Sequence, residues 1–366
     1  MTAKIMTVVG ARPQFIKAAV VSHALSEYEG VKEEIVHTGQ HYDANMSQTF
    51  FDELDIPEPK VNLGVSGGTH GQMTARMLEA LETQMIESNP AVVLLYGDTN
   101  STLAAALAAA KLHIPIVHVE AGTRTHSATN PEEINRICTD HVATKLLCCT
   151  QENFDNLKLE NLADRAEFVG DPMYDAFLRY SEVAKKPRLT GILGEGASLE
   201  LPEEFYYVTC HREENTGVDE TMSGLLDALS SLDSPVVYPV HPRNRSMVKR
   251  LAAKDSLSNI LFVEPVGYLE SVYLVNHAKQ VITDSGGLQR EAFFAGVKCT
   301  TILDFKVWPE TMVDGRNLLA RPTRESIRTA MEKPQTIDRD YQPFGDGNAA
   351  KRIADSVVGL AKGCSR

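Results

Sequence analysis

Three acidic side chains in the first half of the chain have the chemistry and the spacing needed for proton transfer. Asp98 and Glu120 each come directly after a short apolar run, and Glu132 stands at the start of a segment with helical character. A carboxylate that is held against a reacting atom can take a proton from it or return one. Each position also has a structural explanation, since Asp is a common N-cap and acidic residues that follow a proline pair with the helix dipole. Both interpretations stay open at this point.

The elements that must position these carboxylates follow a regular order. Short apolar runs alternate with helical segments, and this alternation predicts a parallel sheet whose strand-end loops line a ligand crevice. In the first half of the chain, strands are expected up to residue 9 and over residues 31–37, 92–96, 115–119, 145–149 and 166–169. The first half is therefore predicted to be a doubly wound α/β domain, with Asp98 and Glu120 at its crevice.

Basic and polar residues in the same half are placed to receive an anion. Gly10 turns the chain into a helix that carries Arg12 and Lys17, and the N-terminus of a helix attracts negative charge. One glycine falls short of a dinucleotide fingerprint, so this turn alone predicts only a weak anion site. His41, in the loop after the second strand, is explained equally well as a site residue and as a turn residue.

The second half of the chain repeats the pattern and brings positive charge to strand ends. Strands are expected over residues 205–210, 235–240, 259–263, 280–283 and 298–303. His211, Arg212 and His241 follow two of these strands, and a Ser-Gly-Gly run at 285–287 lies between a third strand and a helix. Backbone N–H groups and a hydroxyl at a helix N-terminus suit a phosphate, so this run predicts a phosphate site.

A chain of 366 residues is longer than one hydrophobic core usually supports, which predicts two domains. Residues 1–184 are expected to form the first Rossmann-like domain and residues 202–346 the second. The intervening residues 185–201 are rich in Lys, Pro and Gly and are interpreted as a linker. Whether a last helix at 347–366 packs back onto the first domain is left open. Two such domains leave a cleft between them, where ligand sites are favoured.

Composition excludes several classes of protein. A formal net charge of -13 argues against a nucleic-acid binder or a protein that binds anionic membranes. No window reaches the ~18 apolar residues that a membrane span requires. The six cysteines lack CxxC spacing and no ligand grouping has the spacing of a zinc site, so reduced thiols in the cytoplasm and no metal are expected. No nicotinamide is expected either, because the dinucleotide fingerprint is missing.

Taken together, the chain resembles the non-hydrolysing UDP-N-acetylglucosamine 2-epimerases, two-domain enzymes of the GT-B type fold. The resemblance spans nearly the whole length and is specific only when the motifs are combined. The motifs are Gly10-Ala11-Arg12-Pro13 with Lys17, Gln40-His41, Gly97-Asp98-Thr99, the run from His118 to Gly122, Pro131-Glu132-Glu133 with Asn135-Arg136, His211-Arg212, the run from Tyr238 to His241, and the run from Thr283 to Gly287 with Glu291.

This resemblance implies an isomerase that interconverts UDP-GlcNAc and UDP-ManNAc. It inverts C2 through elimination of UDP to a 2-acetamidoglucal and re-addition, supplies precursors of bacterial surface polysaccharides, and forms a homodimer. The resemblance gives acid, base or orienting roles to Asp98, Glu120, Glu132 and His211. It gives substrate contacts to Arg12, Lys17, Gln40, His41, Arg136, Arg212, His241, Tyr268, Ser285, Gly286, Gly287 and Glu291, with Glu291 on the ribose hydroxyls and Arg136 paired with carboxylates.

Three positions depart from the pattern of the better known family members. Gln14 replaces a Glu, Asp43 replaces a Gln of members with a second, activating UDP-sugar site, and Trp308 replaces an Arg. An acidic Asp43 would repel a pyrophosphate, which argues against such an activating site. These changes fit a subgroup that includes epimerases acting on UDP-2,3-diacetamido-2,3-dideoxyglucuronic acid, the alternative substrate.

Two other classes of protein share some of these features. A GT-B glycosyltransferase would use the same UDP-binding half, but it usually needs one base rather than several carboxylates. A nucleotide-sugar sensor would gain nothing from carboxylates that face an anionic ligand. Turnover without an acceptor distinguishes the epimerase from both.

Overall fold

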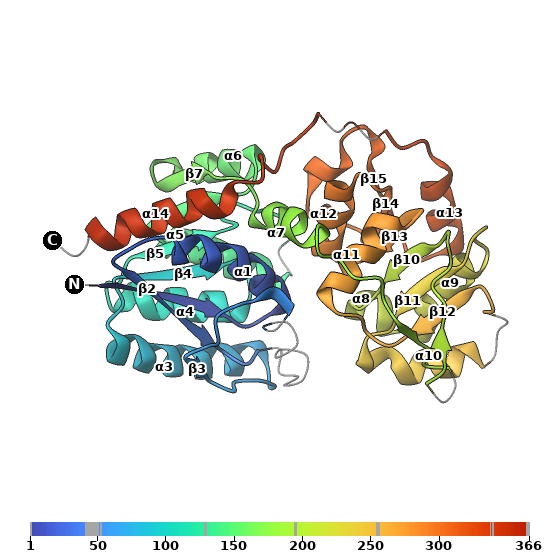
Figure 1. Cartoon of the computed structure of the whole chain (residues 1–366), viewed down its shortest axis with the longest axis horizontal. Helices are drawn as coiled ribbons and strands as arrows, with labels where there is room; N and C mark the ends of the chain where they lie inside the picture. Colours follow the sequence, from blue (N-terminus) through green and yellow to red (C-terminus); the bar gives the residue numbers. More distant parts are fainter. Residues whose placement is uncertain are drawn as a thin grey trace. The chain divides into compact units, whose positions relative to one another are not determined.

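The computed structural model of the chain describes residues 2–40, 51, 53–127, 130–193, 196–253, 257–336, 338 and 340–363. The chain divides into two compact units, Met1–Ala176 with Gln342–Arg366, and Phe177–Tyr341. Each unit has its own parallel sheet with helices on both faces (Figure 1). Helix α7 (Pro172–Ser181) contains the point at which the first unit ends and the second begins.

The first unit is built on a sheet with the strand order β3-β2-β1-β4-β5-β6-β7, in which every neighbouring pair is parallel. All residues of its central strand β4 are fully buried, which explains why the sequence of this strand is a continuous apolar run. The strands are β1 (Ala3–Val9), β2 (Val31–His37), β3 (Val61–Asn62), β4 (Val92–Tyr96), β5 (Ile116–Val119), β6 (Lys145–Cys148) and β7 (Ala166–Phe168).

Helices α3 and α4 cover one face of this sheet, and α1 and α14 cover the other (Figure 1). Helix α3 begins at a capping box, in which Thr69 and Gln72 satisfy each other's backbone N–H groups, and ends at left-handed Asn89. Helix α14 packs its buried apolar positions against α1, β1 and β4. The helices are α1 (Arg12–Ser26), α3 (His70–Ser88), α4 (Asn100–Lys111), α5 (Pro131–Val142), α6 (Gln151–Leu159) and α14 (Ala349–Gly363), with the short η1 (Ala163–Arg165).

The second unit has a parallel sheet with the order β12-β11-β10-β13-β14-β15 and a separate antiparallel hairpin, β8-β9. Its strands are β8 (Leu189–Thr190), β9 (Ser198–Leu199), β10 (Tyr206–Thr209), β11 (Val236–Pro239), β12 (Ile260–Val263), β13 (Gln280–Thr283), β14 (Cys299–Ile302) and β15 (Asn317–Ala320). Its helices are α8 (Glu213–Thr216), α9 (Asp219–Ser230), η2 (Pro242–Asn244), α10 (Arg245–Ala252), α11 (Tyr268–His277), α12 (Gly286–Ala295), η3 (Pro309–Gly315) and α13 (Arg324–Glu332).

Both sheets reverse their strand order once, between β1 and β4 in the first unit and between β10 and β13 in the second. Ligands of doubly wound proteins bind at the carboxyl ends of the strands on either side of such a reversal. The turn at Gly10, after β1, is tightly packed there: a Cβ atom on Gly10 would lie 2.3 Å from Thr38 Oγ1 and 2.2 Å from Ser101 Oγ. Only glycine allows these segments to approach so closely.

The predicted fold class, two doubly wound Rossmann-like domains, is confirmed. The structure divides the chain within α7, whereas the sequence analysis placed the end of the first domain at residue 184. Residues 185–201 were interpreted as a linker and belong to the second unit, where they carry the hairpin β8-β9. Strands of two residues have no hydrophobic periodicity that a sequence pattern can reveal. Every helix in the described part of the chain is too short or too polar to cross a membrane.

Gly122 and Gly359 provide a matched test of the backbone. Gly122 has a φ of 81°, and a Cβ atom there would lie 2.1 Å from the backbone oxygen of Asn153, so Gly122→Ala should destabilise the protein by about 3 kcal/mol. Gly359 lies within α14 with open space around it, and Gly359→Ala should stabilise the protein by about 0.5 kcal/mol. Urea unfolding of both variants measures these changes. A Gly122→Ala variant as stable as the wild type would contradict the left-handed backbone and the close packing described for Gly122.

Candidate functional site

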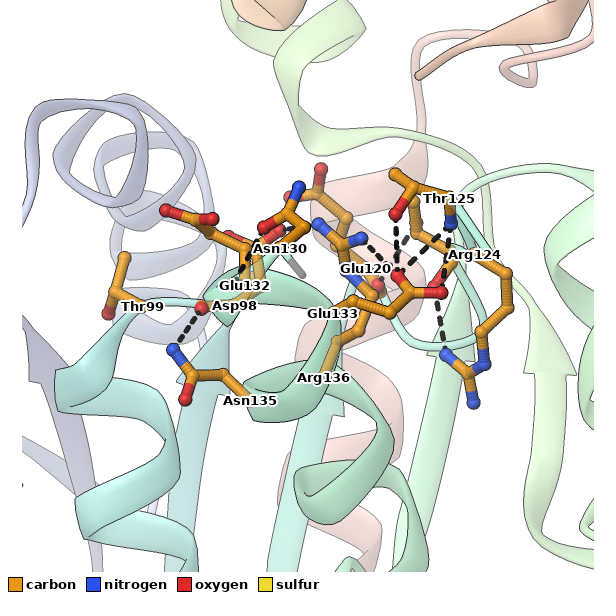
Figure 2. Close-up of polar contacts among 12 residues, drawn as sticks. Asp98, Thr99, Glu120, Arg124, Thr125, Asn130, Glu132, Glu133, Asn135 and Arg136 are labelled. Atoms are coloured by element: carbon orange, nitrogen blue, oxygen red, sulfur yellow. Dashed lines mark hydrogen bonds and ion pairs between the residues drawn. The ribbon is translucent and has the colours of Figure 1, made fainter. Parts of the chain in front are cut away.

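The carboxylate of Asp98 lies in the turn after β4 and forms an ion pair with the guanidinium of Arg136 (Figure 2). Helix α4 is capped by Thr99, whose hydroxyl accepts the N–H of Thr102, so the interpretation of Asp98 as the N-cap is wrong. Burial would raise the pKa of Asp98, but the charges of Arg136, Lys17 and His118 outweigh it and hold the pKa below its usual value. About a third of the side chain, 34%, is exposed. Asp98 is therefore an ionised carboxylate that a ligand can reach.

Arg136 binds two acidic residues at once. Its side chain is only 5% exposed, and besides Asp98 it donates to Glu133 Oε2 over 2.5 Å. Glu133 also accepts the backbone N–H groups of Thr125 and His126, and its pKa lies below the usual value because these bonds and Arg136 outweigh the effect of burial. Glu133 thus fixes the loop before α5.

Glu132, the neighbour of Glu133, has a different environment. It is exposed, and its backbone N–H donates to the side chain of Asn130, the N-cap of α5, over 2.8 Å. The described residues give Glu132 none of the ion pairs that hold Glu133 and Asp98. Of the two first-turn carboxylates, Glu132 is thus the exposed one, while Glu133 is held by hydrogen bonds and an ion pair.

Glu120 follows β5 in a left-handed backbone conformation, with a φ of 71°, which is unfavourable for a residue with a side chain. Its side chain is 11% exposed and forms an ion pair with Lys17 of α1. Both charged ends lie over Gly97, since a Cβ atom on Gly97 would be 3.5 Å from Glu120 Oε2 and 3.7 Å from Lys17 Nζ. Residues from β1-α1, β4 and β5 therefore meet at one edge of the first sheet.

Two glutamines join the turns around this edge. Gln14 is 2% exposed; its Nε2 donates to Tyr96 O over 2.7 Å, and its Oε1 accepts the N–H groups of Gly10 and Ala11. A neutral amide is needed here because a glutamate could not donate to a carbonyl oxygen. Gln40 Oε1 accepts the backbone N–H and the hydroxyl of Ser101. The replacement of Glu by Gln14 thus has a structural reason, which the sequence alone did not reveal.

In the second unit, Asp284 follows β13 and its carboxylate is fully buried. It accepts the backbone N–H groups of His211 and Arg212 over 2.9 and 2.8 Å, and it lies 3.0 Å from His211 Nδ1. Burial would raise its pKa, but the bonds and charge of His211 outweigh this and lower the pKa to about 2. His211 is 41% exposed, so Asp284 orients an imidazole that a ligand can reach.

The other predicted residues of the second unit occupy different places. Ser285 caps α12, and Gly286 and Gly287 form the first residues of that helix, where backbone N–H groups point outward. The exposed ring of His241 stacks near that of His211, with 6.4 Å between centroids. Arg212 donates to the backbone oxygen of Asp284. Tyr268 and Glu291 are both 4% exposed, and Tyr268 packs edge-on against Tyr180.

The structure thus groups the predicted residues within each unit. The first unit brings together Arg12, Lys17, Gln40, Asp98, Glu120, Glu132 and Arg136 around one sheet edge, and Arg12 is half-buried at the start of α1. His41 lies outside the described residues. Within the described ranges, no cluster of three His, Cys, Asp or Glu side chains has a geometry suited to a metal. The sequence analysis did not predict that Glu133 and Asp284 hold neighbouring loops through backbone N–H groups. Their positions, shortly after a proline and directly after a strand, are the signals that could have indicated such a role.

The lowered pKa of Asp284 predicts a specific dependence of stability on pH. Since its folded-state pKa is about 2 against an ordinary 3.8, its ionised form stabilises the protein above pH 4, and this contribution disappears as the pH falls towards 2. It amounts to about 2 kcal/mol. Asp284→Asn should therefore lose less unfolding free energy than the wild type between pH 5 and pH 2.5, as measured by urea unfolding. Asp227→Asn, at an exposed pair with Arg324, is the control and should follow the wild type.

Known proteins resemble this chain over nearly its whole length. The sequence matches the family described as UDP-N-acetylglucosamine 2-epimerase over residues 23–358. A relative from Pseudomonas aeruginosa, named UDP-2,3-diacetamido-2,3-dideoxy-D-glucuronate 2-epimerase, is 46% identical and the match covers 98% of this chain and 100% of the relative. A UDP-N-acetylglucosamine 2-epimerase homolog from Methanococcus maripaludis is 42% identical, with coverage of 98% and 100%.

Solved structures show the same architecture. The Methanocaldococcus jannaschii UDP-GlcNAc 2-epimerase, in complex with UDP-GlcNAc and UDP, superimposes with a TM-score of 0.86 at 33% identity, covering 97% of this chain and 99% of that one. The expected GT-B type fold is thereby confirmed. With the family match extending over most of the sequence, the chain belongs to the UDP-N-acetylglucosamine 2-epimerase family.

Proposed function

We propose that this protein is a non-hydrolysing UDP-sugar 2-epimerase that interconverts UDP-GlcNAc and UDP-ManNAc without a metal or redox cofactor. The observation that carries the proposal is the group of carboxylates at one edge of the first sheet. Asp98 and Glu120 are paired with cations there, and Glu132 is exposed beside them. Inversion at C2 needs a group that removes a proton and one that returns a proton to the other face.

The proposed reaction has two halves. A carboxylate removes the proton from C2, the C–H electron pair forms the C1=C2 double bond, and the bond from C1 to the β-phosphate oxygen breaks with its electrons on UDP. In the second half, an oxygen of the β-phosphate of UDP attacks C1 again while C2 receives a proton on the opposite face. Atoms and charge balance without water or an oxidant, which explains why several acidic groups and no cofactor are needed.

The leaving group carries much of the cost of this reaction, because a UDP anion forms. Ser285, Gly286 and Gly287 offer the N-terminus of α12, whose backbone N–H groups and dipole favour phosphate charge. We propose that His211, which Asp284 orients, donates a hydrogen bond to an oxygen of the departing phosphate. We propose that the second unit binds UDP.

A second substrate is favoured by a specific comparison. The Pseudomonas aeruginosa relative at 46% identity is named for UDP-2,3-diacetamido-2,3-dideoxy-D-glucuronate, which bears a carboxylate that UDP-GlcNAc lacks. In this chain the exposed Lys306 precedes Val307 and Trp308, which lie 3.4 Å from a Cβ position on Gly286. A cation beside the phosphate-binding turn would suit a sugar acid. We therefore propose this uronate as the alternative substrate.

We further propose that the enzyme works in the cytoplasm as a homodimer, as its family resemblance implies. Nucleotide sugars are the only partners proposed, since the net charge of -13 opposes binding to nucleic acid or to anionic lipid.

The reaction can be tested with purified protein in deuterated water and no acceptor. UDP-GlcNAc should gain deuterium at C2 and yield the manno epimer, detected by NMR and mass spectrometry. If only the diacetamido uronate exchanges, the alternative substrate is correct.

The three carboxylates are tested by amide variants. Asp98→Asn, Glu120→Gln and Glu132→Gln should each lower kcat about 100-fold or more with modest changes in KM. Asp155→Asn, an exposed site on α6, is the control. No exchange with either sugar would refute the proposal.

The placement of UDP has its own test. Gly286→Leu puts a bulky side chain at the N-terminus of α12 beside Trp308, so the Kd for UDP should rise at least about 10-fold in calorimetry. Gly359→Leu, on an open part of α14, is the matched control and should bind UDP like the wild type. Unchanged affinity of Gly286→Leu would mean that UDP binds elsewhere.

A further inference from the structure

A buried polar cluster lies beneath the carboxylates of the first unit. It consists of His118 on β5, Asp140 on α5 and Arg124 in the loop between them, and these three side chains are 0 to 2% exposed. Asp140 Oδ1 lies 2.7 Å from His118 Nδ1, and Asp140 Oδ2 lies 2.8 Å from Arg124 Nη1. None of the three has a role in the proton transfer or the UDP binding proposed above.

The geometry fixes the protonation of His118. Its Nδ1 faces the carboxylate of Asp140, and its Nε2 lies 2.7 Å from the backbone oxygen of Gly97. The oxygen of a peptide group can only accept a hydrogen bond, and so can an ionised carboxylate. The guanidinium of Arg124 lies 2.8 Å from Asp140 Oδ2, and the backbone N–H of Gly122 donates to the same oxygen, so the carboxylate is ionised. Both ring nitrogens of His118 must then donate, which makes the ring a buried imidazolium.

The two ends of the cluster hold the two turns that carry the acidic residues. His118 binds Gly97, the residue directly before Asp98, and Gly97 has a φ of 62°. Asp140 Oδ2 accepts the backbone N–H of Gly122 over 3.1 Å, two residues after Glu120. The left-handed backbone of Glu120 costs free energy and persists only where neighbouring contacts enforce it, and this bond is one such contact.

We propose that His118 and Asp140 are positioning residues for epimerisation: as a buried ion pair, they hold the turns of Asp98 and Glu120 in fixed register. Only the kinetic part of this proposal rests on the function proposed above. A small displacement of a reacting group lowers the rate of the chemical step more than it lowers substrate affinity. The His118–Asp140 pair does not touch the substrate. It therefore affects kcat indirectly, by positioning Asp98 and Glu120.

The ionic state is tested on the wild-type protein with 15N-labelled histidine, whether or not the enzyme turns over either sugar. In the folded protein both ring nitrogens of His118 should give protonated, imidazolium-type resonances, since each faces an acceptor. His37 is an internal control, because it is 2% exposed, burial lowers its pKa, and its Nδ1 accepts the N–H of Gly39, so it should show one unprotonated nitrogen. The resonances of each histidine are assigned by their loss in the variant that lacks it, His118→Gln or His37→Gln. An unprotonated nitrogen on His118 would overturn the ion pair.

The positioning role is tested by steady-state kinetics of Asp140→Asn and His118→Gln. Each should lower kcat about 10- to 100-fold with KM and the Kd for UDP unchanged, and the double variant should be no slower than the slower single one. Glu34→Gln removes another buried carboxylate of the same unit, bonded to Ser88 and Lys60, and should keep the wild-type kcat. Wild-type kcat in both variants would overturn the proposal. So would failure of both to fold while Glu34→Gln folds, since the role would then be structural.

Discussion

A carboxylate at the end of a parallel sheet is stabilised by a neighbouring cation, and such ion pairs fix the elements of the first unit around one edge of its sheet. Arg136 shows the constraint most clearly, because one guanidinium that is 5% exposed serves Asp98 and Glu133 together. Removing one partner of such a buried group costs about 3 to 5 kcal/mol, so the helix that carries Arg136 cannot shift without disturbing both carboxylates. Lys17 imposes the same condition on Glu120 and fixes α1 against β5.

The two units share a structural feature, a buried aspartate that lies beside a histidine. In each, a fully buried aspartate accepts at least one backbone N–H group from a turn and lies beside a histidine: Asp140 with His118, and Asp284 with His211. The difference lies in the second ring nitrogen. His118 is fully buried and bonded on both sides, whereas His211 is 41% exposed. The first arrangement holds the imidazole on both sides, and the second leaves part of the imidazole exposed.

Sequence patterns predicted much of the fold for physical reasons. Strands such as β4 are buried on both faces and read as continuous apolar runs, and acidic or basic residues directly after such runs must lie at the carboxyl edge. The hairpin β8-β9 was overlooked, because strands of two residues leave no periodicity. The helix cap was assigned to Asp98 as one alternative, yet Thr99 takes it, since either residue type can cap and only the backbone decides.

The sequence predicted where the acidic side chains lie, but it did not predict the residues that hold them in place. Asp98, Glu120 and Glu132 stand at positions that a strand or a proline identifies. Asp140 lies within a helix, and nothing in its neighbourhood indicates that it bonds to a turn 18 residues earlier. In the sequence, Gln14 stood out only because it differs from the usual family residue. Its role in joining the turns around β1 and β4 depends on hydrogen bonds to residues 82 and 88 positions away, which a sequence pattern does not reveal.

The central claim is that C2 is inverted while the bond between C1 and UDP is broken and remade. The most direct measurement uses substrate with 18O in the bridge between C1 and the β-phosphate. If UDP leaves and returns, this label should move into the non-bridging oxygens of the β-phosphate during epimerisation, and 31P NMR should show the isotope shift. Complete epimerisation over many turnovers with the 18O still in the bridge would contradict the account, because C2 would then be inverted without elimination of UDP.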